Sequence, residues 1–259
     1  MHLTHFFTAF SARQVLWTLT FASQLVLLTV LLGRDRVRRY PWFTAGITLY
    51  ALQLMAEVLL SGRMAMLPLQ EIFLGLGVVS VLVSLAVIVE VAWNAFAAAP
   101  RSLWIANTAG LLAVAGGILA AWGPWPVWKQ LALETLLGKL RLTQVIAQKG
   151  DTLVSLLTVG VGLLVVIFGR QFKAGWRSHT QMIAIGLSTV ALAGLAVQGT
   201  VQHILRSAHP ATRQEYERIL SLLANLMNGH KVVYIAAIVW WIIWLWMDEP
   251  GAATQPTTE

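Results

Sequence analysis

Polar and ionisable side chains inside apolar stretches are the residues of this sequence that could do chemistry. Glu57 follows Gln53 by one helical turn, so both lie on one face of a helix. Such residues are costly in a membrane and are the first place to seek function. If their segments neighbour one another, they predict a polar pocket that opens outward and binds a small ligand, a proton or a cation. The candidate residues are Gln53, Glu57, Gln198, Gln202, His203 and His230.

Several of these residues also have other interpretations. Glu57 could pair with Arg63, and Glu90, in another apolar run, could pair with Arg101. His203 and His230 could hold a haem, because membrane b-type haems are bound between histidines on different helices. A histidine at a helix end is more simply an interfacial polar residue, so we predict no cofactor.

Recognisable catalytic motifs are missing from the sequence. It contains no cysteine, no HExxH zinc motif, no GxSxG elbow and no P-loop. Its six histidines are too scattered for a zinc site. We therefore expect no metal and no enzymatic activity.

Seven apolar segments must position the candidate residues. The chain is 58% hydrophobic and only 11% charged, whereas soluble domains carry roughly 25% charged residues. A helix needs about 20 apolar residues to cross a bilayer and satisfies all of its backbone groups internally. We predict an all-α transmembrane bundle over 1–249 and a disordered cytoplasmic tail over 250–259. The predicted spans are 12–33, 41–61, 70–96, 102–122, 152–169, 181–203 and 231–247.

Short basic connections predict the orientation of the bundle. Positive charge marks the cytoplasmic side of a membrane protein. We therefore expect the N-terminus outside and the C-terminus in the cytoplasm, in the cell membrane of a bacterium. This placement of the net charge of +7 is typical of topology rather than of nucleic-acid binding. The residues that set the orientation are Arg34, Arg36, Arg38, Arg39, Arg170, Lys173 and Arg177.

Two segments between the spans have the apolar periodicity of amphipathic helices, 127–148 and 212–227. In the second, Thr212 and Glu215 form a T-x-x-E capping box, and Asn228-Gly229 is typical of a helix end. We expect both helices to lie on the outer face. There they would cover the bundle or serve as a lid or a docking surface.

The fourth span carries small residues at intervals of four. Small residues let helices approach closely, so the stripe predicts close packing either within the bundle or across a homodimer. The stripe consists of Ala109, Ala113, Gly117 and Ala121.

Three functions fit these features. The first is a sensory or receptor-like module that reads a small ligand, or the state of the membrane, from outside. The second is an accessory or anchoring subunit of a larger membrane complex, with a membrane or cytoplasmic partner. The third is a small transporter that handles protons or cations through Glu57. In each case the lipid bilayer is the first partner.

Overall fold

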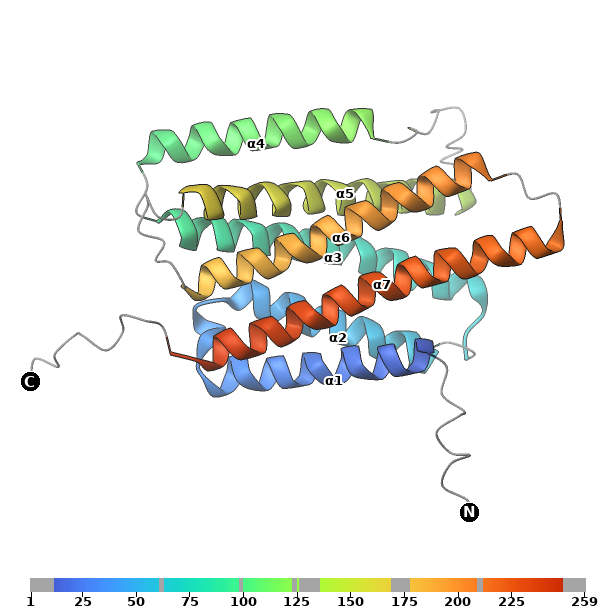
Figure 1. The fold of residues 1–259 in the computed structure, drawn as a ribbon, viewed down its shortest axis with the longest axis horizontal. Coiled ribbons are helices and arrows are strands. Elements are labelled where there is room, and N and C mark those ends of the chain that lie inside the picture. Colours follow the sequence, from blue (N-terminus) through green and yellow to red (C-terminus); the bar gives the residue numbers. More distant parts are fainter. Residues whose placement is uncertain are drawn as a thin grey trace, which may run out of the picture.

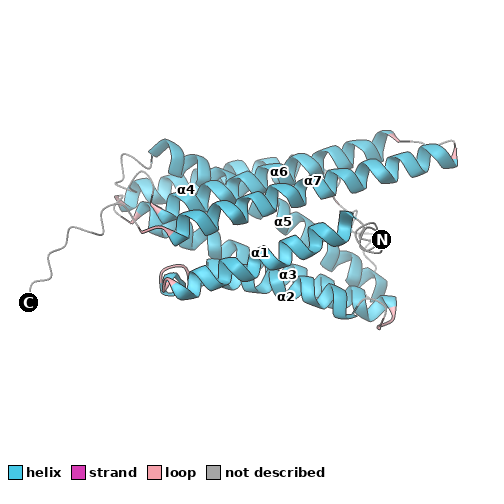
Figure 2. Ribbon diagram, turned by 60° about the horizontal axis from the view of Figure 1, so that its bottom comes forward, coloured by secondary structure: helices cyan, strands magenta, loops and turns pink. Residues whose placement is uncertain are grey.

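The structure, a computed structural model, describes residues 12–60, 63–97, 100–122, 125, 136–168, 178–208 and 212–248. This part of the chain is all-helical, which confirms the predicted all-α class with seven α-helices (Figure 1, Figure 2). The α-helices are α1 (Ala12–Gly33), α2 (Pro41–Leu60), α3 (Met66–Phe96), α4 (Arg101–Ala121), α5 (Leu136–Phe168), α6 (His179–Ser207) and α7 (Arg213–Trp246), and a short 3-10 helix, η2 (Arg36–Arg38), follows α1.

The outer surface of the bundle is apolar. Leu32, Leu82 and Ile167 are each more than 60% exposed. Soluble monomers rarely expose large contiguous apolar surfaces. In the described part of the chain, six helices are long and apolar enough to cross a membrane, and α4 adds a shorter apolar stretch, Ile105–Ala121. The chain is therefore a multi-pass membrane protein.

Six of the helices form a closed ring. Contacts run from α1 to α2, α2 to α3, α3 to α5, α5 to α6, α6 to α7, and from α7 back to α1. The fourth helix stands at the edge of the bundle and packs mainly against α5 (Figure 1). Leu111 of α4 fits against Gly160 of α5, where any larger residue would collide with the leucine. Lys149 of α5 donates a hydrogen bond to the carbonyl of Trp122, just after α4.

The small-residue stripe of α4 faces away from the ring. Ala109, Ala113, Gly117 and Ala121 are all exposed. A side chain added at Gly117 would meet nothing within 4 Å. The stripe therefore does not pack inside the bundle, because α4 docks on α5 through another face, which buries Ala115 to 2% exposure.

The two segments expected to be separate amphipathic helices are the beginnings of α5 and α7. The capping box of Thr212 and Glu215 is present, but Asn228-Gly229 does not end the helix. A glycine within a helix costs only about 1 kcal/mol, and α7 is held here by its packing against α6 and α1. The beginning of α7 extends beyond the other helices (Figure 2).

A similar difference is found at the start of the fifth span, which was predicted at residue 152. Helix α5 is continuous from Leu136, so Asp151 lies within a helix rather than in a loop. Gly150 lets α5 pack closely against α3 at this point, because a side chain there would come within 2.9 Å of Val81 on α3. Residues 127–135 of the first amphipathic segment lie outside the described residues.

The bundle has two unlike ends. The basic end carries Arg34, Arg36, Arg38 and Arg39 around η2, together with the start of α6 and the end of α7. Asp248 lies 3.4 Å from Arg34 and 3.9 Å from Arg36. Arg170, Lys173 and Arg177 fall outside the described residues. We call the opposite end, where α1 starts and α2 stops, the far end.

Buried polar groups at the basic end hold helix ends together. Glu90 of α3 accepts hydrogen bonds from the backbone N–H groups of Trp42 (3.0 Å) and Phe43 (2.9 Å), in the first turn of α2. A carboxylate there satisfies free donors and complements the helix dipole. The sequence suggests a pair with Arg101, whose side chain is not among those described, whereas both Glu90 oxygens bind α2.

Candidate functional site

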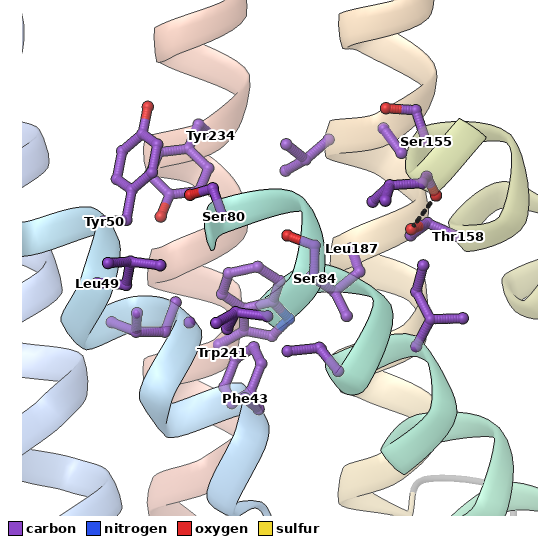
Figure 3. A pocket seen from close by; sticks show the side chains of 18 residues that line it. Phe43, Leu49, Tyr50, Ser80, Ser84, Ser155, Thr158, Leu187, Tyr234 and Trp241 are labelled. Carbon is purple, nitrogen blue, oxygen red and sulfur yellow. Dashed lines mark hydrogen bonds between the residues drawn. The ribbon is translucent and has the colours of Figure 1, made fainter. Parts of the chain in front are cut away.

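A central cavity of about 210 Å³ lies inside the ring. Side chains of α2, α3, α5, α6 and α7 line it (Figure 3). Phe43 and Trp241 meet edge to face at its lower limit in this view, with ring centroids 5.1 Å apart. Its walls are mostly apolar, and hydroxyl groups come from Ser84 and Ser155 among others. Because these residues are small, they leave a space inside the ring of helices that larger side chains would fill.

A second cavity of about 120 Å³, which we call the vestibule, lies between α1, α2, α6 and α7. It shares Tyr50, Val190 and Tyr234 with the central cavity. The two tyrosine rings are 5.1 Å apart between centroids. Tyr50 is 40% exposed although it lines both cavities, so this junction is open to the surroundings. The vestibule is lined by Trp17, Thr20, Tyr50, Leu54, Val190, His230, Lys231 and Tyr234.

Buried polar atoms around the vestibule have no hydrogen-bond partner in the described part of the chain. They are Nε1 of Trp17, Oε1 of Gln24 and Nε2 of His230. The amide nitrogen of Gln24 donates to the hydroxyl of Tyr234 at 3.1 Å, which leaves the Tyr234 proton available to another acceptor. Most buried polar groups in proteins are paired, so a group of unpaired ones indicates a missing partner.

Ionisable groups surround the vestibule. Lys231 lines it and forms no ion pair with a described residue. The predicted spans place Lys231 at the start of the seventh helix, but it lies in the interior of α7. Asp151 is within electrostatic range of His230 and of Tyr50, and Glu57 is within range of Tyr50. Neither carboxylate lines the two cavities.

Two of the predicted site residues bind neighbouring helices. Gln53 donates to the carbonyl of Leu76 (3.1 Å) and to the hydroxyl of Ser80 (3.0 Å) on α3. Gln198 exchanges hydrogen bonds with Thr152 on α5. Their amide groups therefore join helices within the ring, as polar residues in membrane bundles often do.

The other predicted residues separate into two groups. His230 lines the vestibule, and Glu57 is half-buried beside it. Gln202 is half-buried near the end of α6, and His203 is exposed. The ring of His230 lies beside Gly194 on α6, and Gly194 is nine residues before His203. That separation is about 13 Å along the helix, so the structure does not bring the two histidines to opposite faces of one haem. The described residues also contain no group of three possible metal ligands.

The sequence interpretation missed several residues of the site. Trp17, Thr20 and Gln24 recur at helical intervals on one face of α1, and His230 and Tyr234 do so on α7. This spacing was the available signal, because a polar stripe inside an apolar helix must face the interior. Asp151 was missed because the lysine, glycine and aspartate there suggested a loop.

Comparisons with protein-family models, with curated proteins and with solved structures find no match to this chain.

Proposed function

We propose that this chain is a receptor-like seven-helix module that binds a small molecule in the vestibule and the central cavity. The observation that carries the proposal is the junction of the two cavities at Tyr50 and Tyr234, next to the unpaired polar atoms of Trp17 and His230. Ligand sites are typically concave and mostly apolar, with a few convergent polar groups. The proposed activity is binding, not catalysis.

We further propose that the basic end faces the cytoplasm and the far end faces outward, in the cell membrane of a bacterium. The arginines around η2 support this orientation, because short cytoplasmic connections are rich in Lys and Arg. A ligand would then reach the vestibule from the outer half of the bundle. The signal would leave through the basic end to a cytoplasmic or membrane partner.

Val190 offers the experiment that tests the proposal. It lines both cavities, so Val190→Phe should fill their junction. Val239→Phe is the matched control, because Val239 is 45% exposed on the outer surface of α7. A library of small organic acids, amines and neutral analogues would be screened by thermal unfolding of the full chain in lipid nanodiscs.

We expect a class of compounds to raise the unfolding temperature of the wild type and of Val239→Phe, but not of Val190→Phe. Bound ligands stabilise the folded state by mass action. The proposal would be rejected if no compound stabilised the wild type, or if Val190→Phe responded equally.

A second candidate function is that of a subunit in a larger assembly, a homodimer included. The exposed stripe of α4 supports it, because Ala109, Ala113, Gly117 and Ala121 leave a smooth helix face that other helices can approach closely. Native mass spectrometry of wild type and Gly117→Leu would test it. An assembly that is present in the wild type and lost in the variant is expected, and a wild-type monomer would contradict it.

A third candidate function is proton or cation transport. Glu57 and Asp151 lie within electrostatic range of Tyr50 at the opening of the cavities, and ionisable groups within a membrane often mark ion pathways. Proton flux into proteoliposomes should then fall in Glu57→Gln and not in Glu71→Gln, a control at an exposed residue of the far end. Unchanged flux in Glu57→Gln would remove Glu57 from that role.

A further inference from the structure

The polar groups that line the vestibule are mainly hydrogen-bond donors. Lys231 is a cation, and Trp17 can only donate. The Tyr234 hydroxyl already accepts from Gln24, so its proton points elsewhere. Among the described residues, no acidic side chain lines either cavity. A lining with one cation and no acidic side chain is suited to an anionic group.

Lys231 is the centre of this donor set. It is half-buried in the interior of α7, and no described carboxylate lies within ion-pair distance of it. Asp151 of α5 is within electrostatic range of His230 and does not line the vestibule. A half-buried ammonium group without a counter-ion is unfavourable, because burial removes hydration that only an opposite charge or hydrogen bonds restore. A bound anion would supply that charge.

The central cavity has a different chemistry. Aliphatic and aromatic side chains form most of its wall, and its lower limit is the pair Phe43 and Trp241 (Figure 3). It would take the apolar part of a ligand whose charged group stays in the vestibule. Typical ligand sites have volumes of about 300–1,000 Å³. With volumes of about 210 Å³ and 120 Å³, the two cavities therefore suit a small molecule.

We propose that the site takes a small amphiphilic monocarboxylate. Its carboxylate binds Lys231, and its apolar tail passes beside Val190 and the packed rings of Tyr50 and Tyr234, which line both cavities, into the central cavity. This inference rests on the proposed function of the same cavities. It adds the sign of the ligand's charge and the orientation of the ligand in the two cavities.

Octanoate, octanol and octylamine are the probes, since they share one tail and differ in the head group. Their binding to the full chain in nanodiscs would be followed by tryptophan fluorescence and by isothermal titration calorimetry. We expect octanoate to bind the wild type at least about tenfold more tightly than octanol, because hydrogen bonds to charged groups are stronger than those between neutral groups.

Variants at Lys231 separate charge from packing. Lys231→Gln should lose the preference for octanoate over octanol, and Lys231→Arg should keep it. Lys139→Gln is the matched control, because Lys139 is exposed near the start of α5, and it should behave as the wild type. Unfolding temperatures without ligand would show that each variant is folded.

The outcomes separate this inference from the proposed function. Equal binding of octanoate and octanol, tighter binding of octylamine, or an unchanged preference in Lys231→Gln would overturn the carboxylate while leaving a ligand site. If no probe bound and the Val190→Phe screen were also negative, both proposals would fail. Competition of octanoate by palmitate placed in the nanodisc lipid would indicate a ligand drawn from the membrane, and binding without such competition would indicate a water-borne acid. Either result supports the carboxylate.

Discussion

The basic end and the vestibule differ in how their buried polar groups are used. Pairing is not complete at the basic end, where Nε of Arg36 is buried without a hydrogen-bond partner among the described residues, but several of its polar side chains join helix ends. At the basic end, Tyr40 bonds Thr180 at 2.8 Å, His179 bonds the carbonyl of Met247 at 3.0 Å, and Glu90 caps α2. Around the vestibule, the atoms Nε1 of Trp17 and Nε2 of His230 are buried without a hydrogen-bond partner in the described structure.

The contrast extends to packing. The largest fully buried side chains include Tyr40, Phe43, Trp241 and Leu245, all in the half of the ring near the basic end. The cavities open above them, toward the far end. Unpaired polar atoms occur in both halves, so the cavities, and not the unpaired atoms alone, mark the vestibule as a candidate binding site.

Glu90→Ala should give the largest loss of stability and is the strongest challenge to this comparison. Two backbone N–H groups of α2 would lose their acceptor, and each unsatisfied buried donor costs about 1–3 kcal/mol. We expect the free energy of unfolding to fall by about 3 kcal/mol, and by less in Glu90→Gln, which keeps one acceptor. Unfolding in nanodiscs would measure it. A Glu90→Ala protein as stable as the wild type would show that the hydrogen bonds between Glu90 and α2 contribute little to stability.

Gly186→Ala tests the dense half from the side of packing. The indole of Trp241 lies against Gly186, so an added methyl group would displace it. Overpacking of this kind costs about 1–3 kcal/mol. Gly110→Ala is the control, because a side chain there meets nothing within 4 Å, and it should be neutral or slightly stabilising. Equal melting temperatures of the two variants would contradict the close contact.

Two substitutions should lower stability to different extents. Tyr40→Phe removes the partner of buried Thr180 and should lower the free energy of unfolding by about 1–2 kcal/mol. Gln24→Met keeps the volume and removes the donor to Tyr234 together with an amide oxygen that is unpaired. Loss of the unpaired oxygen offsets part of the lost hydrogen bond, so stability should fall less than in Tyr40→Phe. Ligand binding should weaken only in Gln24→Met. Equal losses of stability in both variants would erase the distinction between the two regions.

Asp248→Asn should have the smallest effect, although it breaks contacts at the basic end. The Asp248 side chain is 81% exposed, and exposed ion pairs contribute little. We expect a loss of less than about 0.5 kcal/mol, which should vanish in concentrated salt. A larger loss that persists in salt would mean that these arginines, and not the buried groups, stabilise the basic end.

Much of the fold could be predicted from the sequence, because long apolar runs have few alternatives to membrane helices. The Thr212 capping box could also be predicted, because it depends only on the local spacing of residues. The continuation of α5 through Gly150 and of α7 through Gly229 could not be predicted, because packing against neighbouring helices outweighs the weak preference of one glycine. The packing of α3 against α5, with α4 outside, is set by contacts distant in sequence.

The candidate site was only partly predictable. His230 and Glu57 were found because charged or polar residues stand out in apolar runs. Gln53 and Gln198 look the same in the sequence, yet their amides find partners on α3 and α5. Whether a buried polar group is satisfied depends on the facing helix, and periodicity does not identify that helix. Tyr50 and Tyr234 were overlooked because tyrosines are common in membrane helices.

The position of α4 outside the ring has a consequence for how the protein forms. During synthesis α4 is made before α5, which carries its main docking surface. Until α5 is inserted, α4 therefore has no stable neighbour in the lipid. The ring can close only after α5 passes α4 and meets α3. Because few contacts hold it, α4 should be the first helix to detach and the last to join, a separate cooperative unit in hydrogen exchange.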